Sequence, residues 1–228
     1  MADGANFHPM REMRLARRAM RKERKETLYE SGTYWRDRMD LLYYGYVDFI
    51  MRTLARDAKS VIDVGTANSP YLEWFDWIPE RISFDREPPY ASEQVRGLQG
   101  DFLTHDFGRR FDVATCLQVL EHVPKARTFM RRLLAISDLT IISVPYKWPA
   151  RLLDAHIHDP VSLEKVIFWA GREPNYHVIV EEPFRTPKRM IAVFDNTGHK
   201  GSWGKKAIKQ RRLPNGAFGT SGPGDEQV

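Results

Sequence analysis

The stretch that most constrains the fold is residues 60–75, with the sequence SVIDVGTANSPYLEWF. It begins with a short apolar run that ends at Asp63, which predicts a buried β-strand. Gly65 follows at the turn, and Ser69 and Pro70 suit the N-cap and the first position of a helix. A strand, a tight turn and a helix in this order leave backbone N–H groups at the end of a sheet, where a ligand can bind.

Short apolar segments of the same kind recur along the chain, and each predicts a β-strand. They lie at residues 81–85, around Leu98, and at 111–115, 139–144, 176–180 and 189–194. A helix at 124–135 separates two of them. The last two segments are close enough to form a hairpin, whereas the earlier ones suit parallel strands covered on both faces. The sequence therefore predicts an α/β fold with a doubly wound, seven-stranded sheet that is mostly parallel and ends in a C-terminal antiparallel hairpin.

The two ends of the chain differ from this middle part. Residues 10–25 predict a basic helix that suits a solvated arm, a dimer contact or a surface for an acidic partner. The aromatic side chains of residues 29–46 suit either a lid over a pocket or packing against the sheet. From residue 199 onward glycine, proline, serine and lysine dominate, which predicts disorder. We therefore expect an N-terminal helical arm or lid at 1–57, one folded domain at 58–198 and a basic tail at 199–228.

Positive charge is concentrated at these two ends. Residues 1–25 contain eight basic against three acidic residues, and residues 199–228 contain six against two. The remaining residues, 26–198, therefore carry a net charge of about −4. Because nucleic-acid enzymes usually spread basic charge over the active face, the pattern argues against a nucleic-acid substrate.

The cysteine and apolar content predict a cytoplasmic protein. Cys116 is the only cysteine, so no intrachain disulfide can form. No apolar run reaches the roughly 18 residues that span a membrane, and the basic N-terminus lacks the apolar segment of a secretory signal. We expect no membrane association, and the N-terminal helices offer a surface for a homodimer.

The turn after the first strand resembles a cofactor-binding motif. Residues 63–69, DVGTANS, are similar to the first motif of class I S-adenosylmethionine-dependent methyltransferases, an acid followed by small residues spaced two apart. Gly65 keeps the pattern, whereas Ala67 and Ser69 stand where that family usually has glycine. A nicotinamide-binding fingerprint would need GxGxxG, and only its first glycine is present. The resemblance implies a Rossmann-like fold that binds S-adenosylmethionine through Asp63, Gly65 and Ala67.

Two later segments extend the resemblance on the nucleoside side. Asp85 ends the second strand about twenty residues after Gly65, where such folds place a carboxylate for the ribose hydroxyls. Arg86 follows it as a further candidate for cofactor binding. Asp101 and Phe102 stand where the family commonly has an acid or amide for the adenine amino group and an apolar neighbour for the ring.

The most specific similarity lies at residues 117–123, LQVLEHV, which resemble a signature of small-molecule methyltransferases. In that family the loop passes beside the methionine part of the cofactor, so Leu117 and Gln118 are expected near the transferred methyl group. Glu121 and His122 are expected to be structural rather than catalytic, with His122 buried under the site.

A histidine cluster follows the fifth strand. Methyl transfer to a hydroxyl is assisted by a base, and histidine can take a proton near neutral pH, so His156 and His158 are candidate catalytic residues. Asp159 suits the N-cap of a helix at 160–170 that Gly171 would end. The cluster could also bind a divalent metal, but no further ligand set is visible in the sequence, so no metal site is predicted.

These features favour a methyltransferase for a small molecule. No Asn/Asp-Pro-Pro-Tyr/Phe motif follows the fourth strand, which argues against methylation of nucleobase amino groups. The histidines, Trp148 and the tyrosines suit a hydroxyl-rich ligand, so we expect O-methylation of a small polar acceptor such as a sugar or glycoside. An RNA- or protein-directed methyltransferase that uses the basic ends, and a non-catalytic binding module of the same fold, stay open as alternatives.

Overall fold

The computed structural model describes residues 33–36, 38–150, 152–183, 188–198 and 202–204. The chain divides into two compact units, Met1–Asp40 and Leu41–Val228. Helix α2, Thr33–Arg36, belongs to the first unit, and the other described elements belong to the second. The basic helix predicted at 10–25 and most of the predicted tail lie outside the described residues. None of the described helices is long and apolar enough to cross a membrane.

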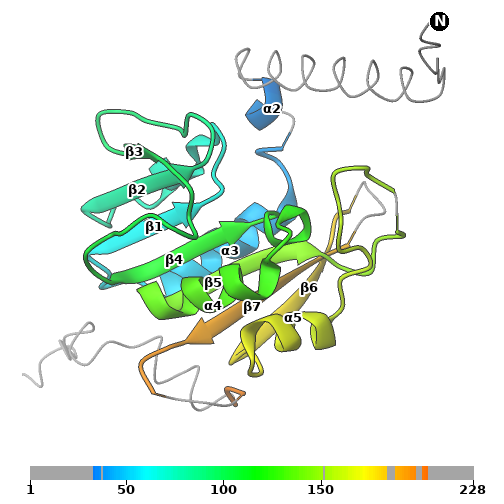
Figure 1. Ribbon diagram of the computed structural model, residues 1–228. Coiled ribbons are helices and arrows are strands. Elements are labelled where there is room, and N and C mark those ends of the chain that lie inside the picture. Colours follow the sequence, from blue (N-terminus) through cyan, green and yellow to red (C-terminus); the bar gives the residue numbers. More distant parts are fainter. Residues whose placement is uncertain (1–32, 37, 151, 184–187, 199–201, 205–228) are drawn as a thin grey trace, which may run out of the picture. The chain divides into compact units, whose positions relative to one another are not determined.

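The second unit is built on a seven-stranded sheet with the order β3-β2-β1-β4-β5-β7-β6 (Figure 1). Its strands are β1 Ser60–Val64, β2 Glu80–Asp85, β3 Arg96–Gln99, β4 Phe111–Leu117, β5 Ser137–Pro145, β6 Tyr176–Glu181 and β7 Lys188–Asp195. Strands β1 to β5 pair in parallel, and β7 is antiparallel to both β5 and β6. The predicted sheet, mostly parallel with a C-terminal antiparallel hairpin, is confirmed.

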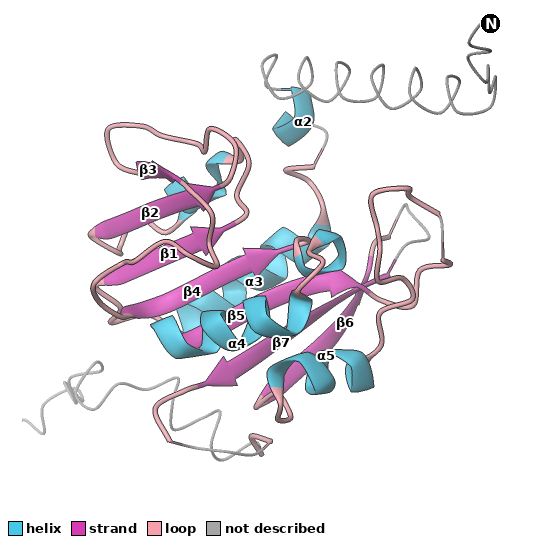
Figure 2. Ribbon diagram, viewed as in Figure 1, coloured by secondary structure: helices cyan, strands magenta, loops and turns pink. Residues whose placement is uncertain are grey.

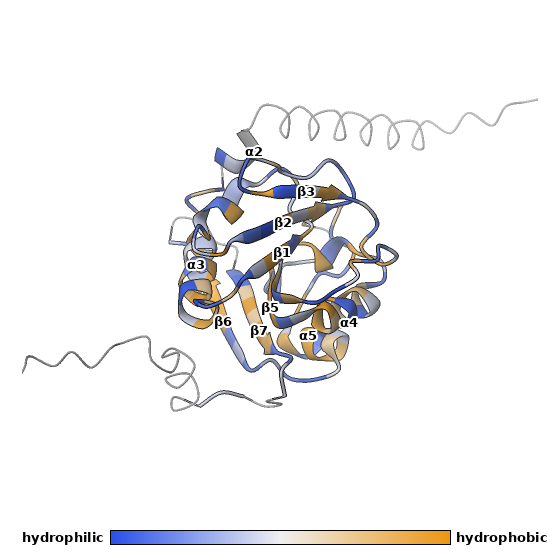
Figure 3. Ribbon diagram, turned by 90° about the vertical axis from the view of Figure 1, so that its left-hand side faces the viewer, coloured by the Kyte–Doolittle hydropathy of each residue, from blue (hydrophilic) through white to orange (hydrophobic). Residues whose placement is uncertain are grey.

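Helices cover both faces of this sheet. Helix α3, Leu42–Leu54, lies on one face, and helices α4, Ala126–Ile136, and α5, Leu163–Ala170, lie on the other (Figure 3). Phe129, Met130 and Leu133 form the buried stripe of α4, at the spacing of an amphipathic helix. The apolar core is thus shared between the sheet and its two helical layers.

The helix predicted after β1 begins at Pro70 as a 3-10 helix, η1 Pro70–Trp74. Pro70 takes the first position as predicted, but the Ser69 side chain makes no capping hydrogen bond. Tyr71 and Phe75 are buried with their rings in edge contact at 5.8 Å, so packing against the core stabilises this short helix.

Helix α5 also begins later than predicted. Ser162, rather than Asp159, is its N-cap, and the Ser162 hydroxyl accepts the N–H of Lys165. Gly171 ends the helix with φ 77, a left-handed conformation that suits glycine, as expected. The Asp159 carboxylate instead contacts His156 through its Oδ2 atom.

The aromatic residues at the start of α3 pack inward. Tyr43 and Tyr44 are buried, and the ring of Tyr44 lies 5.5 Å from that of Tyr71. The buried carboxylate of Glu182, after β6, accepts the first two N–H groups of α3 at 2.7 and 3.3 Å. Arg189 of β7 pairs with the same carboxylate at 3.2 Å. The hairpin therefore anchors the N-terminus of α3 against the sheet.

The parallel strands end at one edge of the sheet (Figure 2). The turn after β1, the loops after β2 and β3, the short helix η2 (Leu120–His122) and the loop from β5 to α5 all leave from this edge. In open α/β sheets ligands bind outside the carboxyl ends of the strands. This edge therefore carries the candidate site.

Candidate cofactor and acceptor site

One carboxylate joins the turn after β1 to the end of β2. The Oδ2 atom of Asp85 accepts the N–H of Ala67 at 2.8 Å, and its Oδ1 atom accepts the N–H of Glu87 at 3.0 Å. Gly65 donates its N–H to the carbonyl oxygen of Phe84 at 2.8 Å. The two segments that the sequence predicted on the cofactor are thus in direct contact.

The turn keeps a glycine-like backbone with only one glycine. Gly65 has φ 86, and a Cβ atom there would lie 2.4 Å from Cγ2 of Val119, so both the backbone and the packing require glycine. Ala67 has φ 50, a left-handed conformation that costs a residue with a side chain about 1 kcal/mol. Ser69 has φ −79, an ordinary value at which glycine is not needed.

Asp63 supports this turn from below. Its Oδ1 atom accepts the hydroxyl of Thr115 at 2.6 Å, and the Thr115 and Tyr71 hydroxyls are 2.8 Å apart. The side chain is almost fully buried, and this burial raises the pKa of Asp63 to about 6, against the hydrogen bonds from Thr115, Tyr71 and Thr66. Asp63 therefore acts through the turn above it rather than at the surface.

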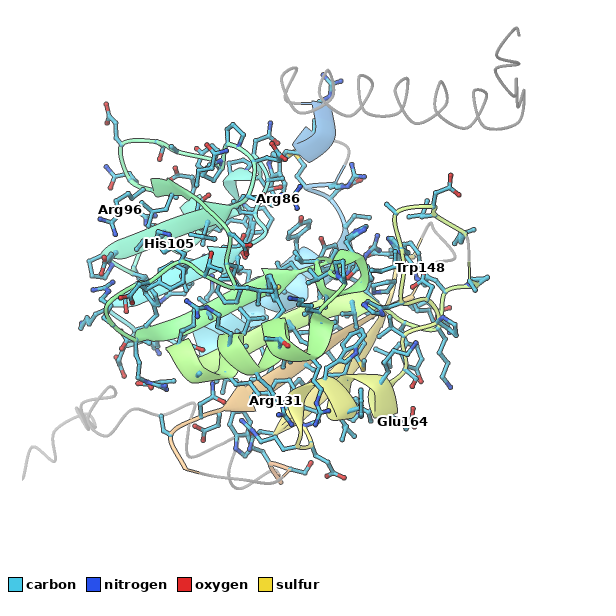
Figure 4. All side chains as sticks on the ribbon, viewed as in Figure 1. Arg86, Arg96, His105, Arg131, Trp148 and Glu164 are labelled. Atoms are coloured by element: carbon cyan, nitrogen blue, oxygen red, sulfur yellow. The ribbon has the colours of Figure 1, made fainter. Side chains whose placement is uncertain are left out.

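The residues predicted to contact the nucleoside part of the cofactor differ in their exposure to solvent. Arg86 is exposed at the carboxyl end of β2 (Figure 4). Asp101 is exposed, and its Oδ1 atom accepts the N–H of Leu103 at 2.9 Å. Phe102 is only 4% exposed and packs in the core, with its ring 4.5 Å from that of Phe129. The contact of Phe102 with an adenine ring stays a prediction.

The residues predicted beside the methyl group end β4. Leu117 is buried, and Gln118 turns the chain with φ 58. The Gln118 side-chain amide donates to the Ser143 hydroxyl at 3.1 Å, and its backbone N–H donates to the Ser143 carbonyl at 2.9 Å. Val119 then packs against Gly65, so the loops after β4 and β1 meet.

Glu121 and His122 follow in η2, and the structure buries the first of them but not the second. The His122 side chain is 41% exposed, so the predicted burial of this histidine is wrong. Glu121 is fully buried, and neither carboxyl oxygen has a hydrogen-bond partner in another residue of the described chain. Burial raises the pKa of Glu121 to about 8; its own N–H opposes the shift, Asp159 adds to it and Arg189 opposes it.

His156 reaches the same place from the loop between β5 and α5. Its Nδ1 atom lies 2.7 Å from Oδ2 of Asp159, and both side chains are buried. Its ring meets that of His122 edge-on, with 4.6 Å between centroids, and stacks on Trp148 at 5.5 Å. Figure 4 shows Trp148 on this loop. His156 and residues 117–123 are far apart in the chain, so their contact could not be predicted from the sequence.

His158 is directed elsewhere. Its Nε2 atom lies 2.8 Å from the carbonyl oxygen of Val123, and its ring meets Trp169 of α5 edge-on at 5.3 Å. The two histidines that are neighbours in the sequence are therefore separated, one at the Glu121 cluster and one against α5.

A hollow at the opposite edge of the sheet is a weaker candidate. Asp112, Asp138 and Asp195 contribute to its lining. Asp112 and Asp195 accept nearby backbone N–H groups, and Asp138 pairs with Arg110 at 2.8 Å. These carboxylates already have partners that stabilise the fold. The hollow also lies at the amino ends of the parallel strands, away from the edge where such sheets bind ligands.

Solved structures of S-adenosylmethionine-dependent methyltransferases share this fold. The N-methyltransferase NodS from Bradyrhizobium japonicum WM9, in complex with S-adenosylhomocysteine, has a TM-score of 0.58 at 14% identity, over 72% of this chain and 92% of its own. The 1,6-didemethyltoxoflavin N1-methyltransferase from Burkholderia thailandensis, with 1,6-didemethyltoxoflavin and S-adenosylhomocysteine bound, has a TM-score of 0.57 at 18% identity, over 86% and 94%. No family model matches the sequence, and no curated protein matches it significantly. At these identities the similarity defines the class I methyltransferase fold.

Proposed function

We propose that this chain is an S-adenosylmethionine-dependent methyltransferase that methylates an oxygen atom of a small polar acceptor, such as a sugar or glycoside. The observation that carries the proposal is the contact between Asp85 and the turn after β1, 2.8 Å from Oδ2 to the Ala67 N–H. A carboxylate at the end of β2, beside a glycine turn, is placed to accept both hydroxyls of a ribose. Two proteins with this fold bind S-adenosylhomocysteine.

The cofactor, when bound, supplies an electrophilic sulfonium methyl group. We propose that its parts are held by the predicted residues Gly65, Ala67, Asp85, Arg86, Asp101, Phe102, Leu117 and Gln118, and that Asp63 contributes by supporting the turn after β1. The work of the chain is then to align the acceptor oxygen with the methyl group and to exclude water, which is worth several orders of magnitude in rate.

Between the two predicted bases, the contacts favour His156. The Asp159 carboxylate, 2.7 Å from Nδ1, fixes the hydrogen on that nitrogen and the lone pair on Nε2. In His158, Nε2 is already directed at the Val123 carbonyl oxygen. Trp148 beside His156 adds an aromatic face on the same loop.

Calorimetric titration with S-adenosylhomocysteine tests the cofactor site. We expect micromolar binding by the wild type and at least tenfold weaker binding by Asp85→Ala. Glu87→Ala is the matched control, because Glu87 contributes its backbone N–H and not its carboxylate to this contact. Absence of binding by the wild type at millimolar ligand would contradict the proposal and favour the non-catalytic module.

Methyl transfer from labelled S-adenosylmethionine then tests the acceptor. Label in hydroxylated small molecules supports the proposal, and label on nitrogen contradicts the choice of oxygen. Label in RNA or protein that declines with salt and is lost without residues 1–25 and 199–228 would support the macromolecular alternative. The arm at 1–57, the domain at 58–198, the tail, a cytoplasmic location and a homodimer stay predictions from the sequence.

A further inference from the structure

We infer that Glu121, His122 and His156 form a binding site for one divalent transition-metal ion at the carboxyl ends of β4 and β5. Their candidate ligand atoms, one carboxylate oxygen and two imidazole nitrogens, lie within 4.8 Å of one another. Nε2 of His122 lies 3.9 Å from Oε1 of Glu121. Three ligands at about 2.1 Å from one tetrahedral ion are about 3.4 Å apart, so small side-chain rotations complete the site.

Glu121 is the residue that points to a cation. Buried polar groups are almost always paired, and a buried carboxylate without a donor is costly. Glu121 is fully buried, and neither oxygen has a partner in another residue of the described chain. The guanidinium of Arg189 pairs with Glu182 at 3.2 Å instead. A divalent ion would supply the missing positive charge.

The two histidines are oriented as metal ligands. Nδ1 of His122 lies 2.9 Å from the carbonyl oxygen of Ala155, and Nδ1 of His156 lies 2.7 Å from Oδ2 of Asp159. A carbonyl oxygen and an ionised carboxylate can only accept, so both Nδ1 atoms carry a hydrogen, and in a neutral imidazole the lone pair then lies on Nε2. Metal-binding histidines usually donate their other N–H to a carbonyl or carboxylate in this way.

The donor set favours one group of ions. Two imidazoles and one carboxylate suit Zn²⁺, Co²⁺ or Fe²⁺, whereas Mg²⁺ and Ca²⁺ prefer oxygen ligands. The partial exposure of His122 gives the ion access to solvent and to an oxygen ligand from outside the chain.

If the proposed function holds, the ion has a use in it. An acceptor hydroxyl bound to the ion would lose its proton to solvent water more easily, because a bound cation lowers the pKa of that oxygen. His156 would then be a ligand rather than the base. EDTA would abolish methyl transfer in that case, whereas transfer that uses His156 as the base alone would survive it.

Metal binding by the untagged full-length protein, dialysed against EDTA and titrated with ZnCl₂, CoCl₂ or MgCl₂, tests the site. We expect one Zn²⁺ or Co²⁺ ion to bind per chain, and Mg²⁺ to bind at least a hundredfold more weakly. Glu121→Gln, which keeps the side-chain shape, and His122→Ala should each weaken Zn²⁺ at least tenfold. Asp159→Asn should weaken it about tenfold through His156. His177→Ala, at an exposed histidine of β6, is the matched control and should leave binding unchanged.

Titration of the same samples with S-adenosylhomocysteine separates the possible failures. A variant that still binds this ligand but has lost Zn²⁺ and the visible absorption of bound Co²⁺ supports the site. A wild type that binds neither Zn²⁺ nor Co²⁺ overturns it, as does unchanged Zn²⁺ affinity in Glu121→Gln and His122→Ala. If His122→Ala binds neither Zn²⁺ nor S-adenosylhomocysteine because it misfolds, the Zn²⁺ affinity of Glu121→Gln alone tests the site. Zn²⁺ binding without S-adenosylhomocysteine binding would leave the metal site standing and reject the proposed function.

Discussion

The two halves of the carboxyl edge satisfy their polar groups in different ways. Beside β1 and β2, both oxygens of Asp85 accept backbone N–H groups, and the farther donor, Ala67, is 18 positions away. Beside β4 and β5, Glu121 is buried without a hydrogen-bond donor from another residue of the described chain, and His122 is oriented by Ala155, 33 positions away. The proposed cofactor half, at the ends of β1 and β2, is therefore preformed by hydrogen bonds to the chain's own backbone. The half beside β4 and β5 depends on how the loop between β5 and α5 packs. Its Glu121 carboxylate is the group that we infer to bind a cation.

The largest effect is expected where local geometry is strictest, at Gly65. Gly65→Ala should lower the free energy of unfolding by about 3–4 kcal/mol, because a left-handed backbone and overpacking against Val119 both contribute. Gly108→Ala should cost only about 1 kcal/mol, because Gly108 has φ 63 but no described atom within 4 Å of an added Cβ. Urea unfolding measures both, and equal losses would show that the clash with Val119 is relieved without cost.

The second effect concerns Asp63, whose pKa in the folded protein, about 6, lies above the ordinary value of 3.8. The folded state therefore binds this proton more tightly than the unfolded state, and stability falls as pH rises from about 4 to above 6. Asp63→Asn removes this loss. The variant should gain up to about 3 kcal/mol relative to the wild type between about pH 4 and about pH 7. Unfolding curves at both pH values measure this, and parallel pH dependence in the two proteins would contradict the raised pKa.

A third effect is expected at the anchor of α3. Glu182→Gln should cost about 2 kcal/mol, because it removes a buried charge that caps the helix and pairs with Arg189. Glu181→Gln, next to it, should cost less than about 0.5 kcal/mol, because Glu181 pairs with Lys188 in solvent. Thermal or urea unfolding of the two variants compares them. A similar cost for both would mean that the hairpin does not hold α3 through this carboxylate.

Strands and turns could largely be predicted from the sequence, whereas contacts between segments far apart in the chain could not. The β-strands were visible as apolar runs, and Gly65 and Asp85 lie at the ends of two neighbouring strands, as predicted. Ser162 replaced Asp159 as the cap of α5, and the Asp159 carboxylate contacts His156, three positions before it. The contact of His156 with the Glu121 cluster, by contrast, joins residues far apart in the chain and depends on how the whole loop after β5 packs. Patterns along the chain carry no information on such contacts. The motif at residues 117–123 indicated one partner, Glu121, but not the other.

The smallest effect is expected at Ala67 and Ser69, where the chain lacks the glycines of the motif. Variants at these positions test whether their side chains weaken cofactor binding. Ala67→Gly relieves a φ of 50, worth about 1 kcal/mol, but frees the unfolded chain by about 0.5–1 kcal/mol, so stability should change by less than about 0.5 kcal/mol. Ser69→Gly relieves nothing at φ −79 and should cost about 0.5–1 kcal/mol. Both variants should bind S-adenosylhomocysteine as the wild type does, because the backbone shape of the turn is already that of a glycine motif. Tenfold tighter binding by Ala67→Gly would mean instead that the methyl group of Ala67 obstructs the cofactor.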